Sequence, residues 1–75
     1  MKPKLFDAVQ LREALLGEGL AKGAIGAIVM EFDKPHEAYE VEFVDDSGAT
    51  LAQVTFRPSQ FAVVWTAPQK SADAA

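Results

Sequence analysis

The chain has 75 residues, of which 49% are hydrophobic and 24% charged, with no cysteine and a net charge of -4 at pH 7. A chain of this length forms one domain, and most of its apolar residues are needed for one core, which leaves little room for a deep pocket. Without cysteine the chain has neither disulfides nor a thiolate metal site, and its negative charge opposes binding to nucleic-acid phosphates.

The basic residues are spread along the chain, and no long apolar segment is present. Lys and Arg occur at positions 2, 4, 12, 22, 34, 57 and 70. This scatter disfavours nucleic acid as a partner. No apolar run approaches the roughly 20 residues that span a bilayer, and polar residues interrupt the N-terminal region before a signal-peptide apolar stretch can form. We therefore expect a cytoplasmic protein without membrane contact.

The first third of the chain allows two interpretations. Asp7 and Gln10 have the spacing of a helix capping box, and apolar residues follow them at helical spacing. Alternatively, Phe6 and residues 9–11 form a first strand, and residues 12–22 form a long loop that contains several glycines. Local rules favour the helix, and the residues alone leave both interpretations open.

A continuous apolar segment at residues 22–32 predicts a long strand. A bend at Gly26 would let this strand contribute to both sides of a small curved sheet. Residues 33–37 are polar, and Pro35 cannot donate a backbone hydrogen bond to a ladder, so we expect the next loop there.

The clearest strand signal begins at Tyr39. Apolar and acidic side chains alternate strictly from this residue, so Tyr39, Val41 and Phe43 share a buried face. Glu40 and Glu42 then face solvent. The period of two predicts one strand of an antiparallel sheet with one wet face.

The rest of the chain predicts two more strands. Residues 45–48 read Asp-Asp-Ser-Gly, which is typical of a hairpin turn, and residues 50–56 form the returning strand. Residues 57–60 interrupt the pairing, as a single 3₁₀ turn would, and residues 61–65 resume it. Residues 67–75 have nothing large to bury, so we expect a flexible, disordered tail.

Four segments of the chain together resemble a known family: KLFDAVQL, GEGLAKGAIGAIV, EAYEVEFVDDSGATLAQVTF and PSQFAVV. They are similar to the bacterial domain of unknown function 4926, over roughly residues 3 to 64. The resemblance implies a small SH3-like barrel in which the opening motif is a strand. It implies no catalytic or binding residues. Residues 12–14 depart from the expected pattern, which leaves open a helical turn within residues 12–22.

The residues and the resemblance together predict an all-β fold. We expect a five-stranded SH3-like barrel over residues 1–66, with a long first loop and the flexible tail at residues 67–75.

No side-chain pattern indicates an active site. His36 is the single histidine and falls in a predicted loop, where a functional role is uncommon. The carboxylates around it, Glu31, Asp33 and Glu37, lack a recognised metal-ligand spacing. Glutamates at alternate strand positions are typical of a solvated face, whereas acid–base catalysis needs two groups in contrasting environments. We therefore predict a non-enzymatic protein without a cofactor or metal.

Two groups of residues are candidates for binding another protein. Acidic side chains on the hairpin could face a basic partner and affect association rate and specificity. Leucines of the long loop either cover the last strand or join its aromatic residue in an exposed apolar patch, where a tryptophan is a natural hot spot. The candidates are Glu40, Glu42, Asp45, Asp46, Leu16, Leu20, Val64 and Trp65.

We therefore expect a protein-interaction module with a protein partner, and self-association stays open. The family resemblance suggests a particular version, an antitoxin or immunity-like partner of a neighbouring gene product. The alternative is a nucleic-acid or ribosome-associated small barrel, whose affinity would fall steeply with salt.

Overall fold

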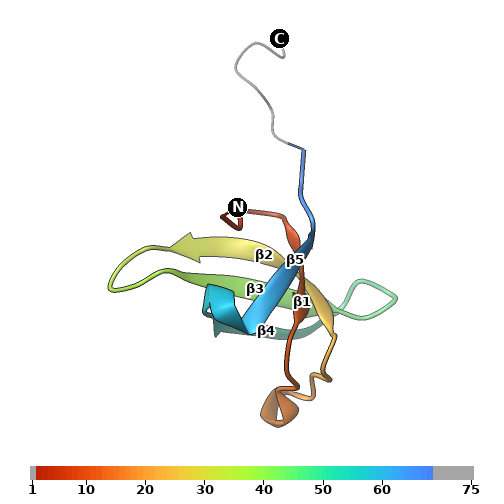
Figure 1. Ribbon diagram of the computed structural model, residues 1–75. Helices are drawn as coiled ribbons and strands as arrows, with labels where there is room; N and C mark the ends of the chain where they lie inside the picture. The colour runs from red at the N-terminus through yellow and green to blue at the C-terminus, as the bar shows by residue number, and fades with distance from the viewer. Residues whose placement is uncertain (1, 69–75) are drawn as a thin grey trace.

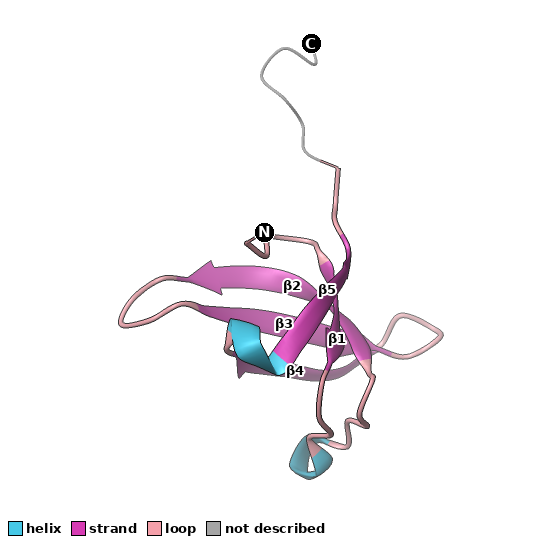
Figure 2. Cartoon of the chain, viewed as in Figure 1, coloured by secondary structure: helices cyan, strands magenta, loops and turns pink. Residues whose placement is uncertain are grey.

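The computed structural model describes residues 2–68, which form a single five-stranded sheet with two short 3₁₀ turns (Figures 1 and 2). The elements in chain order are β1 (Ala8–Leu11), η1 (Leu16–Glu18), β2 (Ile25–Phe32), β3 (Ala38–Val44), β4 (Thr50–Phe56), η2 (Pro58–Gln60) and β5 (Phe61–Trp65). The strand order in the sheet is β4-β3-β2-β1-β5, and every neighbouring pair is antiparallel. Within the described residues, no helix is long and apolar enough to cross a membrane.

The all-β prediction with five strands is confirmed, and the strand order is compatible with an SH3-like barrel. The first segment is a strand, so the helical interpretation of the N-terminal third is wrong. The long loop that follows contains one 3₁₀ turn at Leu16–Glu18, which closes with Gly19 at a φ of 73°. The predicted turns at residues 45–48 and 57–60 are also present, the first with Gly48 at a φ of 90°.

Gly26 lies where β2 passes very close to β3. β2 pairs with β1 through residues 25–27 and with β3 from Ala27 to Phe32, and a register irregularity falls between Ile28 and Met30. A Cβ atom at this position would be 2.7 Å from Val41 Cγ1 and 2.8 Å from the Glu42 carbonyl oxygen. The glycine is required because the strand packs against its neighbour without space for a side chain.

The core lies on the concave face of the sheet. Tyr39, Val41 and Phe43 are buried there, as their alternation predicts. The rings of Tyr39 and Phe61 meet edge to face with centroids 5.8 Å apart, and those of Phe43 and Phe56 meet in the same way at 6.1 Å. The buried apolar side chains of this cluster are Val9, Leu11, Leu20, Ile28, Tyr39, Val41, Phe43, Ala52, Phe56 and Phe61.

The contact between Tyr39 and Phe61 shows that the sheet curls over. β3 and β5 are three positions apart in the strand order, and three strand spacings in a flat sheet correspond to roughly 14 Å. Ring centroids at 5.8 Å therefore require β5 to fold back over β3, as the ribbon shows (Figure 1). The curl is what makes a single sheet enclose a core.

Described contacts extend one residue past the predicted domain boundary at residue 66. Ala67 donates its backbone N–H to the Oδ1 atom of Asp7 at 3.0 Å, although it falls in the segment predicted as a tail. Residues 69–75 of that predicted tail lie outside the described residues.

We predict that Gly26→Ala destabilises the protein strongly. The new methyl group would overlap the Val41 side chain and a β3 carbonyl oxygen, and overpacking of this kind costs about 3 kcal/mol when the backbone cannot yield. Urea unfolding followed by circular dichroism measures the change. Gly17→Ala is the matched control, because no atom lies within 4 Å of the Cβ position at Gly17. Equal stability of the two variants would contradict the close approach of β2 to β3.

Candidate functional site

The convex face of the sheet carries a row of side chains that runs across all five strands. In the register of the ladders, Trp65 lies opposite Ala8, Ala8 opposite Ala27, Ala27 opposite Glu42, and Glu42 opposite Gln53. Directly opposed residues share a face, and this face points away from the core because the next residue after Ala8 is fully buried. The row therefore places an indole and a carboxylate about 14 Å apart across two alanines.

Two acidic side chains on this face are held by β4. Glu42 Oε2 accepts a hydrogen bond from Thr50 Oγ1 at 2.7 Å, and Glu40 accepts one from the side-chain amide of Gln53. Both glutamates point away from the core as predicted, but they are half-buried, because the side chains of β4 lean against them. Their carboxylates are therefore oriented by the sheet.

All charged side chains on the described strands are acidic. Their charged side chains are Glu31, Glu40 and Glu42, whereas every Lys and Arg of residues 2–68 lies in a loop or a terminal segment. The convex face consequently has apolar and acidic groups without a strand-borne cation beside them.

Of the two turn aspartates, Asp45 has a structural role. Its Oδ1 atom accepts hydrogen bonds from the Ser47 hydroxyl at 2.7 Å and from the backbone N–H groups of Ser47 and Ala49 at 2.9 and 3.0 Å. These bonds, the one from the Ser47 hydroxyl foremost, hold the pKa of Asp45 below its usual range. Asp46 is exposed in the same turn, and its side chain makes no hydrogen bond among the described residues.

The leucines of the long loop do not form one patch with the last strand. Leu20 is only 4% exposed and belongs to the core, so its side chain is not on the surface as a binding residue would be. Leu16 is 81% exposed, at the end of the sheet where Arg12 bonds to the Gln60 carbonyl just before β5 begins. Trp65 ends β5, whereas the turn η1, which carries Leu16, lies toward the other end of the sheet (Figure 1).

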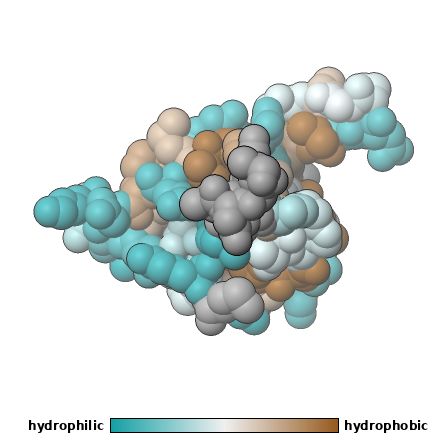
Figure 3. Space-filling view, turned by 90° about the horizontal axis from the view of Figure 1, so that it is seen from above, coloured by the Kyte–Doolittle hydropathy of each residue, from teal (hydrophilic) through white to brown (hydrophobic). Residues whose placement is uncertain are grey.

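Val64 keeps its exposure because no loop leucine covers it. It is 48% exposed and Trp65 is 55% exposed. The prediction that loop leucines cover the last strand is therefore wrong for Val64, since Leu20 turns into the core instead. Seen from above, apolar residues form separate brown areas among polar ones, and no single apolar face dominates this view (Figure 3).

A buried carboxylate joins the two ends of the fold. Asp7 is 1% exposed, and its Oδ2 and Oδ1 atoms accept hydrogen bonds from the backbone N–H groups of Lys4 and Ala67, each at 3.0 Å. The chain reaches this position through a tight turn from Lys4 to Asp7, in which Phe6 has a φ of 70°. Sequence reasoning missed this role because the same residue resembles a helix cap.

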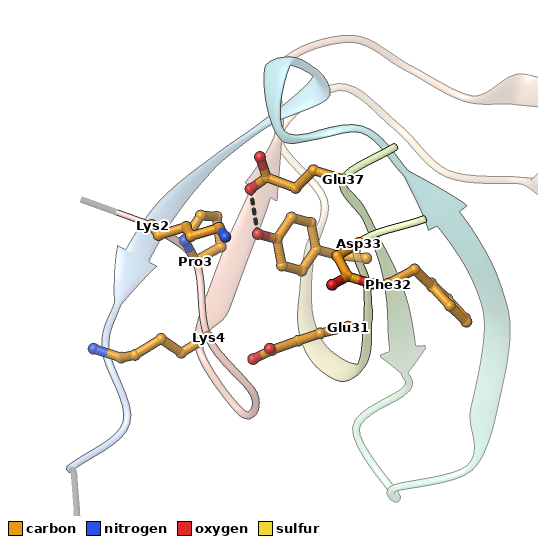
Figure 4. A pocket seen from close by; sticks show the side chains of 8 residues that line it. Lys2, Pro3, Lys4, Glu31, Phe32, Asp33 and Glu37 are labelled. Atoms are coloured by element: carbon orange, nitrogen blue, oxygen red, sulfur yellow. Dashed lines mark hydrogen bonds between the residues drawn. The ribbon is translucent and has the colours of Figure 1, made fainter. Parts of the chain in front are cut away.

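A polar hollow of about 620 Å³ opens beside Tyr39 (Figure 4). The Tyr39 hydroxyl donates to Glu37, and Glu31 Oε2 accepts the backbone N–H of Leu5 at 2.7 Å. Burial raises the pKa of Tyr39 well above its ordinary value, and the hydrogen bond and negative charge of Glu37 raise it further. The residues that line the hollow are Lys2, Pro3, Lys4, Glu31, Phe32, Asp33, Glu37 and Tyr39.

This hollow does not have the ligands of a metal centre. Within residues 2–68, no three His, Asp or Glu side chains converge as metal ligands. His36 is exposed in the β2–β3 loop. Tyr39 holds its proton at neutral pH, so the hydroxyl serves as a hydrogen-bond donor to a carboxylate.

Comparison with known proteins identifies the family of this chain. The family model described as Domain of unknown function (DUF4926) matches residues 5–63. The chain belongs to this family. No curated protein and no solved structure gives a significant match. The matched region of this DUF4926 domain begins before β1 and ends within β5, so it contains four complete strands and most of the fifth.

We predict that the DUF4926 domain loses stability above about pH 10 through Tyr39. The folded state keeps the tyrosine protonated to higher pH than the unfolded state does, so the unfolded chain binds fewer protons there, and the free energy of unfolding falls as pH rises. Tyr39→Phe should remove this part of the pH dependence, at a cost of about 1 kcal/mol at neutral pH. Urea unfolding between pH 7 and pH 11.5, a range that roughly spans the titration of a tyrosine in the unfolded chain, measures both effects.

Absorbance at high pH gives a direct check, because Tyr39 is the single tyrosine of the chain. Ionisation of the folded wild type at the pH of a free tyrosine would contradict the buried hydroxyl.

We also predict that Asp7→Asn destabilises the fold by about 2 kcal/mol. The carboxylate now accepts hydrogen bonds from two backbone N–H groups. The side-chain NH₂ group of asparagine would face one of these donors, and that hydrogen bond would be lost. Hydrogen exchange of the Ala67 amide should also become faster. Asp46→Asn, at an exposed turn position, is the control with an expected change below about 0.5 kcal/mol. An unchanged Ala67 exchange rate would argue against the bond to Asp7.

Proposed function

We propose that this DUF4926 domain is a protein-interaction module that binds a basic protein surface with the convex face of its sheet. The observation that carries the proposal is the row from Trp65 across Ala8 and Ala27 to Glu42. It combines one large exposed aromatic side chain, a flat apolar centre and an oriented carboxylate on a rigid element.

The aromatic end of the row fits a binding hot spot. Trp65 is 55% exposed although it belongs to a strand with a paired backbone. A tryptophan held in this way offers a large contact area and has little conformational freedom to lose on binding. Ala8 and Ala27 beside it leave space for a side chain from the partner.

The acidic end of the row favours a partner of opposite charge. Glu40 and Glu42 are the charged side chains of the convex face, and the whole chain carries a net charge of -4. Complementary charge raises the association rate and selects against acidic partners, nucleic acids included. An antitoxin-like or immunity-like domain that covers a basic protein is one form of this function.

Site-specific photo-crosslinking in the source organism tests which face is used. A benzophenone amino acid at position 53 lies at the end of the row and leaves Trp65 and Glu42 in place. We expect crosslinks to a basic protein from this position and none from the same probe at Leu16, which is exposed at the other end of the sheet. Crosslinks only from Leu16, or to RNA, would overturn the proposal.

Binding measurements with the captured partner give the energetic prediction. Trp65→Ala should weaken the affinity by roughly 30-fold, equivalent to about 2 kcal/mol. Glu42→Gln should reduce the association rate at low salt and have little effect at high salt. Leu16→Ala is the control and should leave the Kd unchanged. Equal affinities of the Trp65 and Leu16 variants would exclude the convex row as the contact.

A further inference from the structure

β5 is an edge strand whose sequence does nothing to prevent pairing. It forms a ladder with β1 on one side, and no ladder on the other side is present among the described strands. Its five residues, Phe-Ala-Val-Val-Trp, include neither a charged residue nor a proline. Edges of natural sheets are usually protected by such residues. Val63, on the free part of this strand, is 37% exposed.

The hydrogen bonds of β1 show which backbone groups of β5 point outward. The Leu11 N–H donates to the Ala24 carbonyl, and the Leu11 carbonyl accepts the Gly23 N–H, so Leu11 bonds toward β2. Phe61 is the partner of Leu11 on the opposite side. The N–H and carbonyl of Phe61 therefore point to the free edge, and by the alternation of an antiparallel ladder those of Val63 do too.

These four groups are spaced so that β5 complements a second β5. If two copies run antiparallel about a two-fold axis at Ala62, Phe61 of each copy lies opposite Val63 of the other. Each such pair exchanges two N–H to carbonyl bonds, so all outward groups of both residues are satisfied. The side chains that meet at the axis are alanines, which allow the close approach of a non-hydrogen-bonded pair.

We propose that two copies of this chain pair along β5, antiparallel about Ala62, to form a two-fold symmetric dimer with one continuous sheet. A groove of about 420 Å³ runs beside the strand, and its lining includes the apolar side chains of Pro3, Pro58 and Val63 as well as the charged ones of Lys2, Asp7 and Arg12. It gives space for the Val63 side chain of the second copy on the core side of the sheet. The convex row with Trp65 stays uncovered, because edge pairing extends the sheet without stacking its faces.

Charge separates this association from the proposed function. Both copies carry a net charge of -4. Two copies of equal net charge repel each other, and added salt should strengthen the dimer by screening this repulsion. Binding of a basic protein to the convex face should instead weaken with salt. The dimer is thus independent of the proposed function and is measured without the partner.

The experiment is sedimentation equilibrium of the full chain over a range of concentrations, with the wild type and two chemically synthesised variants. An N-methyl group on Val63 removes an outward N–H, and we expect it to raise the dimer Kd by roughly 100-fold or more without changing thermal unfolding of the monomer. An N-methyl group on Ala62 removes an N–H that faces β1 and should instead destabilise the monomer. This contrast between neighbouring residues checks the assigned direction of each amide.

Every other result counts against the dimer. A wild type that stays monomeric at the highest concentrations has no such interface. A dimer that survives N-methylation of Val63 uses another surface. Species larger than a dimer would indicate head-to-tail pairing of β5 with β4, the other edge of the sheet.

Discussion

The edge-to-face contact of Tyr39 with Phe61 is the constraint on which the rest of the structure depends. A chain of 75 residues can build only one small core, and a flat five-stranded sheet would leave its apolar face uncovered. By bringing β5 over β3, the contact of the two rings lets the sheet cover its own concave face. The same ring of Tyr39 continues to a hydroxyl bonded to Glu37, so the core ends in a polar hollow.

The curl also explains why a carboxylate is buried at the start of β1. Once β5 lies beside β1, the segment after Trp65 passes close to the turn before Ala8, and backbone N–H groups from both segments need acceptors. Asp7 supplies them with its two oxygen atoms. A carboxylate is suited to this position because it accepts hydrogen bonds from several donors and donates none.

The sequence allowed the elements to be predicted better than their contacts. The alternation around Val41 and the Asp-Asp-Ser-Gly turn are local signals, and the structure confirms both. The capping spacing at Asp7 misled because its partner, Ala67, is 60 residues away. A strand glycine such as Gly26 marks a bend, a bulge or a close backbone approach, and the close approach to Val41 depends on the fold, so the sequence does not reveal it.

The candidate surface was predictable in its residues but not in their grouping. Glu42 and Trp65 could be singled out by charge and size, whereas the register that aligns them through Ala8 and Ala27 depends on three ladders at once. Leu20 shows the reverse, since a loop residue far from any strand signal enters the core. Folding requires a glycine at position 26, where β3 leaves no space. The two alanines point away from the core and are half-buried. Their small side chains keep the surface between the indole and the carboxylate free of large groups.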